Sequence, residues 1–138
     1  MKIVTYKPEY ESAVITLWQK CNLTRPQNNP KKDIQRKLKV QRELFLVGLE
    51  GSKVIATAMG GYDGHRGAVY YLGVDPEYQK QGLGREMMTA LEKKLVEKGC
   101  SKLNLMFRTD NGKVEKFYEK LGYSRDACIE MGKRLIPD

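Results

Sequence analysis

The chain has 138 residues and a mass of 15.8 kDa, which is enough for one domain with its own hydrophobic core. Its 41% content of hydrophobic residues is too high for an intrinsically disordered chain, and no apolar run approaches the length of a membrane span. The N-terminus also lacks the core of a signal peptide, so we expect a single cytoplasmic domain over residues 1–138 with no membrane partner.

The first half of the chain predicts a short strand, two helices and three antiparallel strands. The expected elements, in order, are residues 2–6, the helix after Pro8, and residues 31–40, 44–49, 54–59 and 69–74. The segment 60–67 lies between the last two strands and is too rich in glycine for regular structure.

The second half predicts two strand and helix units followed by two short strands. A helix with one apolar face reaches Lys98, and residues 103–107 then form a strand that must run parallel to its partner. Another helix begins near Asn111 and ends at Gly122. Two short strands, near residues 123–126 and 128–134, are expected to finish the domain.

The formal charge of +8 points to an anionic partner, and much of it lies in one segment. Residues 25–43 carry seven basic and two acidic side chains. A solvated helix face explains this best, and a basic rim that attracts an anionic cofactor or substrate comes second. Nucleic acid ranks third, because the segment has no aromatic residue on which bases could stack.

The three cysteines are far apart and lack the spacing of metal ligands. We expect buried, reduced thiols and no metal site.

Residues 73–85 carry the strongest functional signal in the chain. An apolar strand ends at Asp75 and Pro76, and a basic loop with glycines then leads into an amphipathic helix. Glycine lets the backbone approach an anion, and the first amides of a helix have no intrahelical acceptors. The helix dipole adds a positive end, and Lys80 and Arg85 add charge. The sequence therefore predicts a phosphate-binding loop.

Two common phosphate-binding patterns do not fit this loop. A mononucleotide P-loop has Lys and then Ser or Thr directly after its last glycine, whereas Arg85 and Glu86 follow Gly84. A dinucleotide fingerprint has a third small residue where this chain has Met87. The remaining pattern, Gln-x-x-Gly-x-Gly at residues 79–84, resembles the coenzyme A loop of the GNAT family of N-acetyltransferases.

The resemblance covers the whole chain, because the expected order of strands and helices is that of the GNAT family. The strings at residues 24–26, 59–67 and 70–74 resemble the small YpeA-type bacterial members. The family implies a single-domain α/β (α+β) fold. It has a mixed, mostly antiparallel central sheet of about seven strands, splayed between strands 4 and 5 and flanked by four helices.

The resemblance further implies acetyl-CoA as co-substrate and assigns residues to its binding. The corresponding residues are Leu72, Gly73, Val74, Gln79, Lys80, Gln81, Gly82, Leu83, Gly84, Arg85, Asn111 and Tyr118. Asn111 is equally well explained as a helix N-cap, and an aromatic residue at helical spacing such as Tyr118 is usually core.

The same resemblance predicts direct attack of a primary amine on the thioester through a tetrahedral intermediate. The backbone amide of Val74 would donate to the oxyanion, and Tyr118 would act as general acid toward the leaving thiolate. Some members carry a Glu base in the strand before the loop, but residues 68–74 contain no carboxylate. Asp63 and His65 are the nearest titratable candidates for the base.

The acceptor would be a small-molecule or peptide amine, and the protein a monomer or homodimer. Arg25, Asn28 and Arg66 are available to contact the acceptor, where the two arginines suit a carboxylate or phosphate. These three residues are equally well explained as loop residues that form turns and keep the protein soluble. Two further functions stay open: a catalytically inactive CoA-binding regulatory module, and a basic module that binds nucleic acid or an acidic protein.

Overall fold

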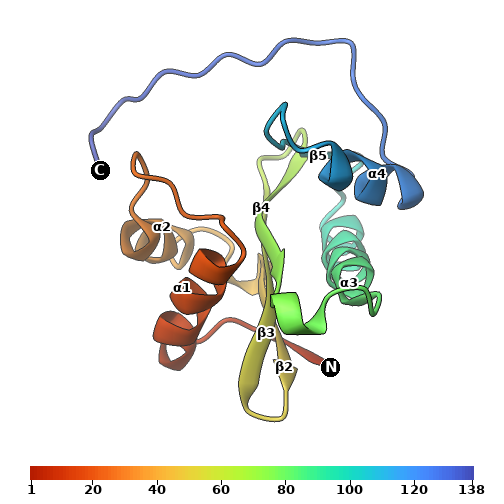
Figure 1. The fold of residues 1–138 in the computed structure, drawn as a ribbon. Helices are drawn as coiled ribbons and strands as arrows, with labels where there is room; N and C mark the ends of the chain where they lie inside the picture. Colours follow the sequence, from red (N-terminus) through yellow and green to blue (C-terminus); the bar gives the residue numbers. More distant parts are fainter. The chain divides into compact units, whose positions relative to one another are not determined.

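A computed structural model describes residues 1–138, which form two compact units, Met1–Leu105 and Met106–Asp138. The first unit contains β1 (Lys2–Thr5), η1 (Pro8–Tyr10), α1 (Glu11–Lys20), α2 (Pro30–Lys37), η2 (Arg42–Leu44), β2 (Phe45–Glu50), β3 (Lys53–Tyr62), β4 (Gly67–Val74), η3 (Pro76–Tyr78), α3 (Leu83–Glu97) and β5 (Leu103–Leu105), where η marks a short 3-10 helix. The second unit contains α4 (Gly112–Lys120) (Figure 1).

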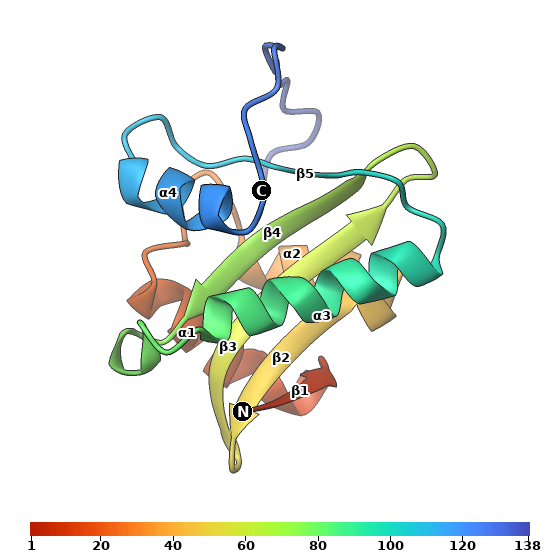
Figure 2. The same cartoon turned by 90° about the vertical axis from the view of Figure 1, so that its right-hand side faces the viewer.

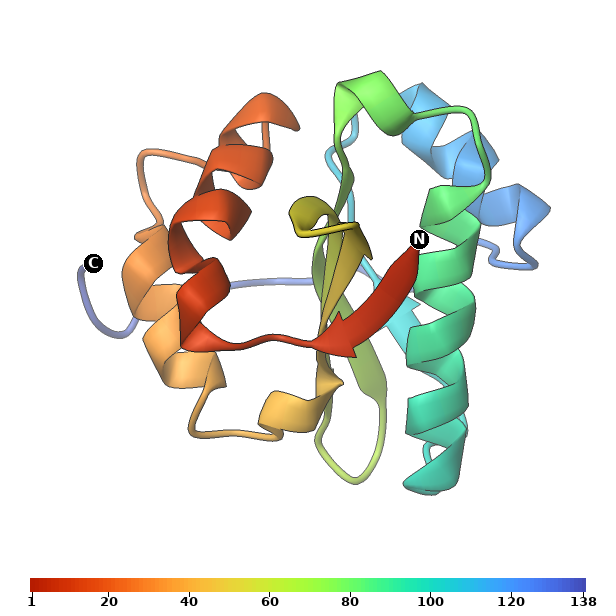
Figure 3. The same ribbon diagram turned by 90° about the horizontal axis from the view of Figure 1, so that it is seen from below.

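The five strands form one mixed sheet in the order β1-β2-β3-β4-β5. The first four are antiparallel neighbours, and β5 pairs parallel to β4, as the sequence predicted. Helices α1 and α2 cover one face of this sheet and α3 covers the other, which is clearest from below (Figure 3). The long α3 runs across β2, β3 and β4 (Figure 2).

Burial follows from this layering. Strands β2 and β3 are buried at nearly every position, because helices cover both faces of the sheet. Helix α1 contributes Val14, Leu17 and Trp18 at helical spacing, and Trp18 is fully buried. The predicted apolar stripe of α3, comprising Met87, Met88, Leu91 and Leu95, is buried against the opposite face.

Half of the glycine-rich segment 60–67 is strand, which corrects the prediction that the whole segment is an irregular connection. Strand β3 continues to Tyr62, β4 begins at Gly67, and only residues 63–66 form the turn. A Cβ atom on Gly60 would collide with the Leu91 side chain. Gly60 thus provides space for α3 on the sheet, whereas Gly64, with a φ of 93°, lies in the turn.

The sheet has five strands, so the expected number of about seven is wrong. Within the second unit, residues 124–138 form no strand, and the apolar side chains of Ile129, Met131, Leu135 and Ile136 are exposed. The segment 128–134 mixes a glycine and three charged residues with its apolar ones, a composition with weak strand preference. The thiol-bearing Cys128 is also exposed, whereas we expected it to be buried.

The close packing at Gly60 can be tested by mutation. We expect Gly60→Ala to lower the free energy of unfolding by about 1–3 kcal/mol, because the Leu91 side chain must move within a filled core. Urea unfolding measures the change. Gly132→Ala is the matched control, since nothing lies within 4 Å of its added Cβ. Equal stability of the two variants would contradict the packing argument.

Candidate active site

The end of β4 presents its backbone at an open edge of the sheet. The pairing of β4 with β5 covers only residues 67–69, so residues 70–74 continue beyond it. The Asp75 amide donates to the Ile55 carbonyl at 2.8 Å. In an antiparallel ladder the preceding residue then directs its amide and carbonyl away from the partner strand. The amide of Val74 therefore points away from β3, toward the edge that β5 does not cover.

A β-bulge in β4 lies just before these residues. Gly73 is opposite Thr57 and Tyr70 is opposite Met59, so Tyr71 and Leu72 together face the single residue Ala58. Tyr71 has a φ of 53°, a left-handed conformation that is uncommon for residues with a Cβ atom.

Residues from three elements surround the bulge. The Tyr71 ring stacks on the Trp18 ring with a centroid distance of 3.8 Å, and its hydroxyl donates to Asp33 Oδ2 at 2.6 Å. Trp18 Nε1 donates to Thr57 Oγ1 at 3.0 Å, and this hydroxyl donates to the Tyr71 carbonyl at 2.8 Å. Our sequence analysis missed this cluster. Its one available signal was Asp33, the only acidic residue between Arg25 and Arg42 in a strongly basic segment.

Gly73 makes room for the end of α1 and the residues after it. A Cβ on Gly73 would lie 3.0 Å from Leu23 Cδ1 and 3.2 Å from Cys21 Sγ. The Cys21 thiol donates to the Val74 carbonyl at 3.2 Å. Burial, and next the nearby Asp75 carboxylate, raise the pKa of this thiol. Gly73 thus allows a close approach, and its neighbours on this face are Cys21 and Leu23, which follow the end of α1.

The predicted phosphate-binding loop, residues 79–85, connects η3 to α3. Its first side chain turns back, because Gln79 Nε2 donates to the Val74 carbonyl at 3.0 Å. Lys80 and Gly82 both have positive φ values, 64° and 79°, which reverse the chain direction. The side chains of Lys80 and Gln81 are exposed.

The start of α3 leaves backbone amides without intrahelical acceptors beside open space. Glu86 N donates to the Gly82 carbonyl at 3.1 Å, so the amides of Leu83 and Gly84 precede the first intrahelical bond. The space above Gly82 is open, since an added Cβ would meet nothing within 4 Å. Arg85 is exposed on the first turn. The free amides at the start of α3, the positive end of the helix dipole and the Arg85 cation therefore lie beside open space, which is the arrangement that phosphate binding requires.

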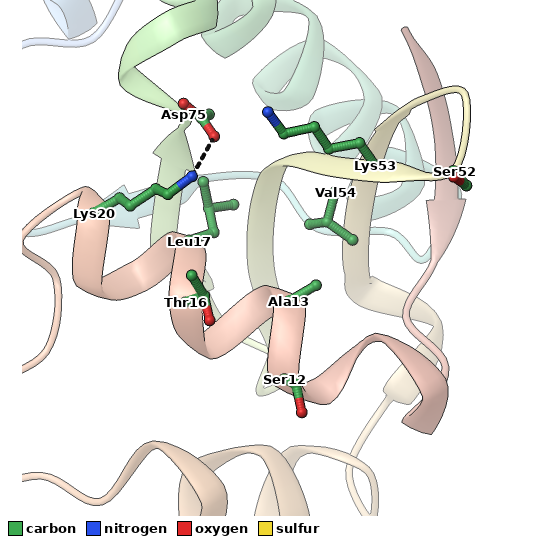
Figure 4. A pocket seen from close by; sticks show the side chains of 9 residues that line it. All are labelled: Ser12, Ala13, Thr16, Leu17, Lys20, Ser52, Lys53, Val54 and Asp75. Atoms are coloured by element: carbon green, nitrogen blue, oxygen red, sulfur yellow. Dashed lines mark hydrogen bonds and ion pairs between the residues drawn. The ribbon is translucent and has the colours of Figure 1, made fainter.

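Asp75 ties the strand end to this loop. Its carboxylate is only 1% exposed, accepts from the Glu77 amide at 3.0 Å, and pairs with Lys20 Nζ at 3.3 Å. The Glu77 amide, and next the Lys20 ammonium, hold the pKa of this carboxyl below its usual range. The contact closes one end of a cavity of about 390 Å³ between α1 and the start of β3 (Figure 4). This cavity is lined by α1, the β2–β3 turn and Asp75, and none of the loop residues 79–85 contributes to it.

The two candidate bases and Arg66 lie at the other end of β4. Asp63 Oδ1 accepts from the amides of His65 at 2.7 Å and Arg66 at 2.8 Å, so its carboxylate closes the β3–β4 turn. These amides, that of Arg66 first, hold the pKa of Asp63 below its usual range. Seven residue steps of strand, about 23 Å, separate Gly67 from Val74. The structure does not bring these residues together with Val74.

Arg25 and Asn28 lie in the α1–α2 connection. Arg25 Nη1 donates to the carbonyls of Asn22 at 2.7 Å and Thr24 at 3.1 Å, which folds the guanidinium onto its own loop. The Asn28 amide donates to the Arg25 carbonyl at 3.0 Å. Leu23 of this connection is the residue that packs on Gly73. Of the three predicted acceptor contacts, Arg25 and Asn28 are therefore on the same connection, and Arg66 is not.

In the second unit, Tyr118 lies in an aromatic cluster. Its ring is 5.0 Å from that of Phe117, 5.7 Å from that of Tyr123 and 6.1 Å from that of Phe107, and the residue is 8% exposed. Burial raises the pKa of Tyr118 to about 12. Asn111 directly precedes α4, but its side chain makes no capping hydrogen bond. The prediction that the Asn111 side chain caps this helix is therefore wrong.

No helix in the structure has both the length and the apolar character that a membrane span requires. No group of three or more His, Cys, Asp or Glu side chains is arranged to hold a metal ion.

The fold is α+β, with the end of β4 left unpaired by β5 and followed by a loop that leads into the N-terminus of α3. Residues 9–123 match the acetyltransferase (GNAT) family, and the chain belongs to this family. The predicted family is thereby confirmed, and membership implies acetyl-CoA as the acetyl donor.

The chain is similar along its full length to bacterial acetyltransferases. It is 48% identical to an acetyltransferase of Pectobacterium atrosepticum over 138 residues, which cover 100% of this chain and 98% of the relative. The protein is thus an acetyltransferase.

Solved structures share the fold at low sequence identity. The ribosomal-protein-S18-alanine N-acetyltransferase of Escherichia coli has a TM-score of 0.76 and 23% identity, over 91% of this chain and 79% of that one. An aminoglycoside 6'-N-acetyltransferase of Acinetobacter haemolyticus has a TM-score of 0.76 and 14% identity, over 99% of this chain and 100% of that one.

The depressed pKa of Asp75 predicts a pH-dependent contribution to stability. A carboxyl whose pKa is lower in the folded state stabilises the fold above its unfolded pKa of about 3.9, and this contribution is lost as pH falls through the folded value. At pH 7 we expect the free energy of unfolding of Asp75→Asn to be about 1–3 kcal/mol lower than that of the unmutated protein. The difference should shrink between about pH 5 and pH 3.

Denaturant titrations across this pH range measure the effect. Glu77→Gln is the control, because Glu77 is exposed and its contact with Lys53 Nζ at 3.7 Å contributes little. A deficit in Asp75→Asn that is the same at pH 7 and pH 3 would show that the carboxylate charge is not its cause.

Proposed function

We propose that the protein is an acetyl-CoA-dependent N-acetyltransferase that acts on a primary amine of a small molecule or peptide, with residues 1–138 working as one catalytic domain. One observation carries this proposal. The edge of β4 that β5 leaves uncovered ends directly in the loop that opens α3. A thioester bound along this edge would have its pyrophosphate at the helix N-terminus.

The donor site follows from these neighbours. Acetyl-CoA supplies the acetyl group as a thioester. The amides of Leu83 and Gly84, with Lys80 and Arg85, would bind its pyrophosphate, while residues 72–74 would bind the pantetheine arm through their backbone. Gln79 would act indirectly, since its amide group holds the loop to the Val74 carbonyl.

Val74 would stabilise the developing negative charge. Its amide points to the uncovered edge because the hydrogen-bonded pair formed by Asp75 and Ile55 fixes the alternation of the ladder. An amide fixed in this way can donate to the acetyl carbonyl oxygen as that oxygen becomes negative. The role needs no side chain, so substitution at residue 74 would not remove it.

Tyr118 would donate a hydrogen bond to the leaving sulfur, as the family resemblance implies. With a pKa of about 12, its hydroxyl keeps its proton at neutral pH. Complete transfer of this proton to a thiolate of pKa about 8.5 would be uphill by about 5 kcal/mol. The Tyr118 hydroxyl therefore serves better as a hydrogen-bond donor than as a full proton donor.

The acceptor is a separate question, because the same fold serves different acceptors. The two solved structures named above belong to enzymes for a ribosomal-protein alanine and for an aminoglycoside. Arg25 and Asn28 lie in the α1–α2 connection that packs on Gly73, which supports a role for them beside the acceptor. Arg66 lies at the distant turn, so nothing comparable supports a role for it.

The function is tested by thiol release from acetyl-CoA across a panel of small amines, polyamines, amino acids and peptides. We expect release that depends on one class of amine, together with a rise in melting temperature when CoA is added. Thiol release that no amine accelerates, combined with tight CoA binding, would instead identify an inactive CoA-binding module.

The role of Tyr118 is tested by removing only its hydroxyl. We expect Tyr118→Phe to lower kcat about 10–100-fold with little change in KM for acetyl-CoA, because the lost hydrogen bond acts mainly on the leaving thiolate. Tyr123→Phe, which alters the same aromatic cluster, is the matched control. An unchanged kcat in an assay limited by chemistry would refute the assignment. With the pKa of Tyr118 at about 12, this hydroxyl should cause no loss of activity up to pH 10.

A further inference from the structure

We propose that Asp33 is a positioning residue for acetyl transfer, which acts through the Tyr71 hydroxyl on the β4 bulge and so on the orientation of the Val74 amide. The inference rests on the role given to Val74 in the proposed function. Asp33 lies on α2, and no family pattern in the sequence pointed to it.

The bulge determines which way Val74 faces. Beyond the bulge, Gly73 pairs with Thr57 and Val74 with Ala56. If Tyr71 relaxed to an extended conformation, β4 would lose its extra residue and the pairing beyond it would shift by one position. Such a shift exchanges the hydrogen-bonding directions of neighbouring residues. The Val74 amide would then point toward β3 instead of toward the uncovered edge.

Tyr71 needs external contacts to keep its conformation. A left-handed φ of 53° is disfavoured for a residue with a Cβ atom and persists only where the surroundings fix it. The Thr57 hydroxyl holds the backbone carbonyl, and the Trp18 ring holds the plane of the side chain. Neither contact fixes the far end of the ring, where the hydroxyl meets Asp33 Oδ2 at 2.6 Å.

Asp33 is itself well anchored for this task. It lies in the first turn of α2, where the helix dipole favours a carboxylate, and its amide donates to the Asn29 carbonyl at 2.9 Å. Arg36 Nη1 approaches the other carboxylate oxygen, Oδ1, at 3.6 Å. The bond to Tyr71 is charge-assisted and therefore among the stronger hydrogen bonds a phenol can make.

The test combines Asp33→Ala, Tyr71→Phe and their double variant in steady-state acetyl transfer. Tyr71→Phe keeps the stack on Trp18 and removes only the hydroxyl. We expect kcat to fall about tenfold in each single variant, and about tenfold, not a hundredfold, in the double variant, because the two groups act as one unit. KM for acetyl-CoA should change less than about threefold, since the loop that binds pyrophosphate is untouched.

Two variants serve as controls. Asp33→Asn keeps an oxygen that accepts the Tyr71 proton and should retain most of kcat. Tyr70→Phe changes the neighbouring tyrosine, which is 52% exposed, and should behave like the unmutated protein. Values of kcat within twofold of the unmutated protein for both single variants, or a hundredfold loss in the double variant, would overturn the proposal.

An NMR measurement separates this inference from the proposed function. Amide resonances of residues 72–74 should shift in Asp33→Ala and Tyr71→Phe but not in Tyr70→Phe. If the unmutated protein acetylates no amine, the proposed function fails, and the amide shifts alone decide whether Asp33 acts on β4. Unshifted resonances in the first two variants would overturn the inference whatever the activity.

Discussion

Tyr71 holds a left-handed backbone conformation in the middle of β4, and α1, α2 and β3 each contribute a contact to it. The register of the strand beyond this point depends on that conformation. This register directs the Val74 amide to the uncovered edge and aligns Asp75 with Ile55. Asp75 in turn accepts from the amide of η3, from which the chain enters the loop before α3. The proposed donor site would thus depend on a sheet register as much as on the glycine loop.

The absence of a carboxylate in β4 shifts attention to the pKa of the acceptor amine. Deprotonation of a lysine-type amine of pKa about 10.4 costs about 4.6 kcal/mol at pH 7, whereas an α-amine near 7.8 costs about 1.1 kcal/mol. Asp63 already uses its carboxylate to close the β3–β4 turn, at the opposite end of β4 from Val74. An acceptor with a low pKa therefore needs least help from the protein.

The sequence predicted those parts of the fold that depend on local pattern. The stripe of α3, the helix ends at Gly99 and Gly122, and the parallel pair of β4 and β5 all follow from periodicity and glycine chemistry. Gly60 was misjudged because its role comes from Leu91, a residue distant in sequence that packs against it. A stretch of glycines reads as a turn unless the helix that crosses it is known.

The candidate site shows the same division. The predicted phosphate-binding loop is a contiguous motif, so a single sequence can suggest it directly, and its role stays a prediction. The cluster of Trp18, Thr57, Tyr71 and Asp33 draws on four elements and has no spacing that a single sequence could show. The last two expected strands, near residues 123–126 and 128–134, do not form. A strand is stable only where a neighbouring strand completes the ladder, and residues 124–138 have none in this structure.

Four of the seven basic residues in the segment 25–43 lie on α2. The Glu43 carboxylate is paired with Lys98 at 2.6 Å and Asp33 is engaged with Tyr71, so the exposed side of α2 displays chiefly cations. Helices α2 and α3 cover opposite faces of the sheet (Figure 3). The cations of α2 are therefore displayed on one face of the sheet, whereas α3, which begins next to Lys80 and Arg85, covers the other face.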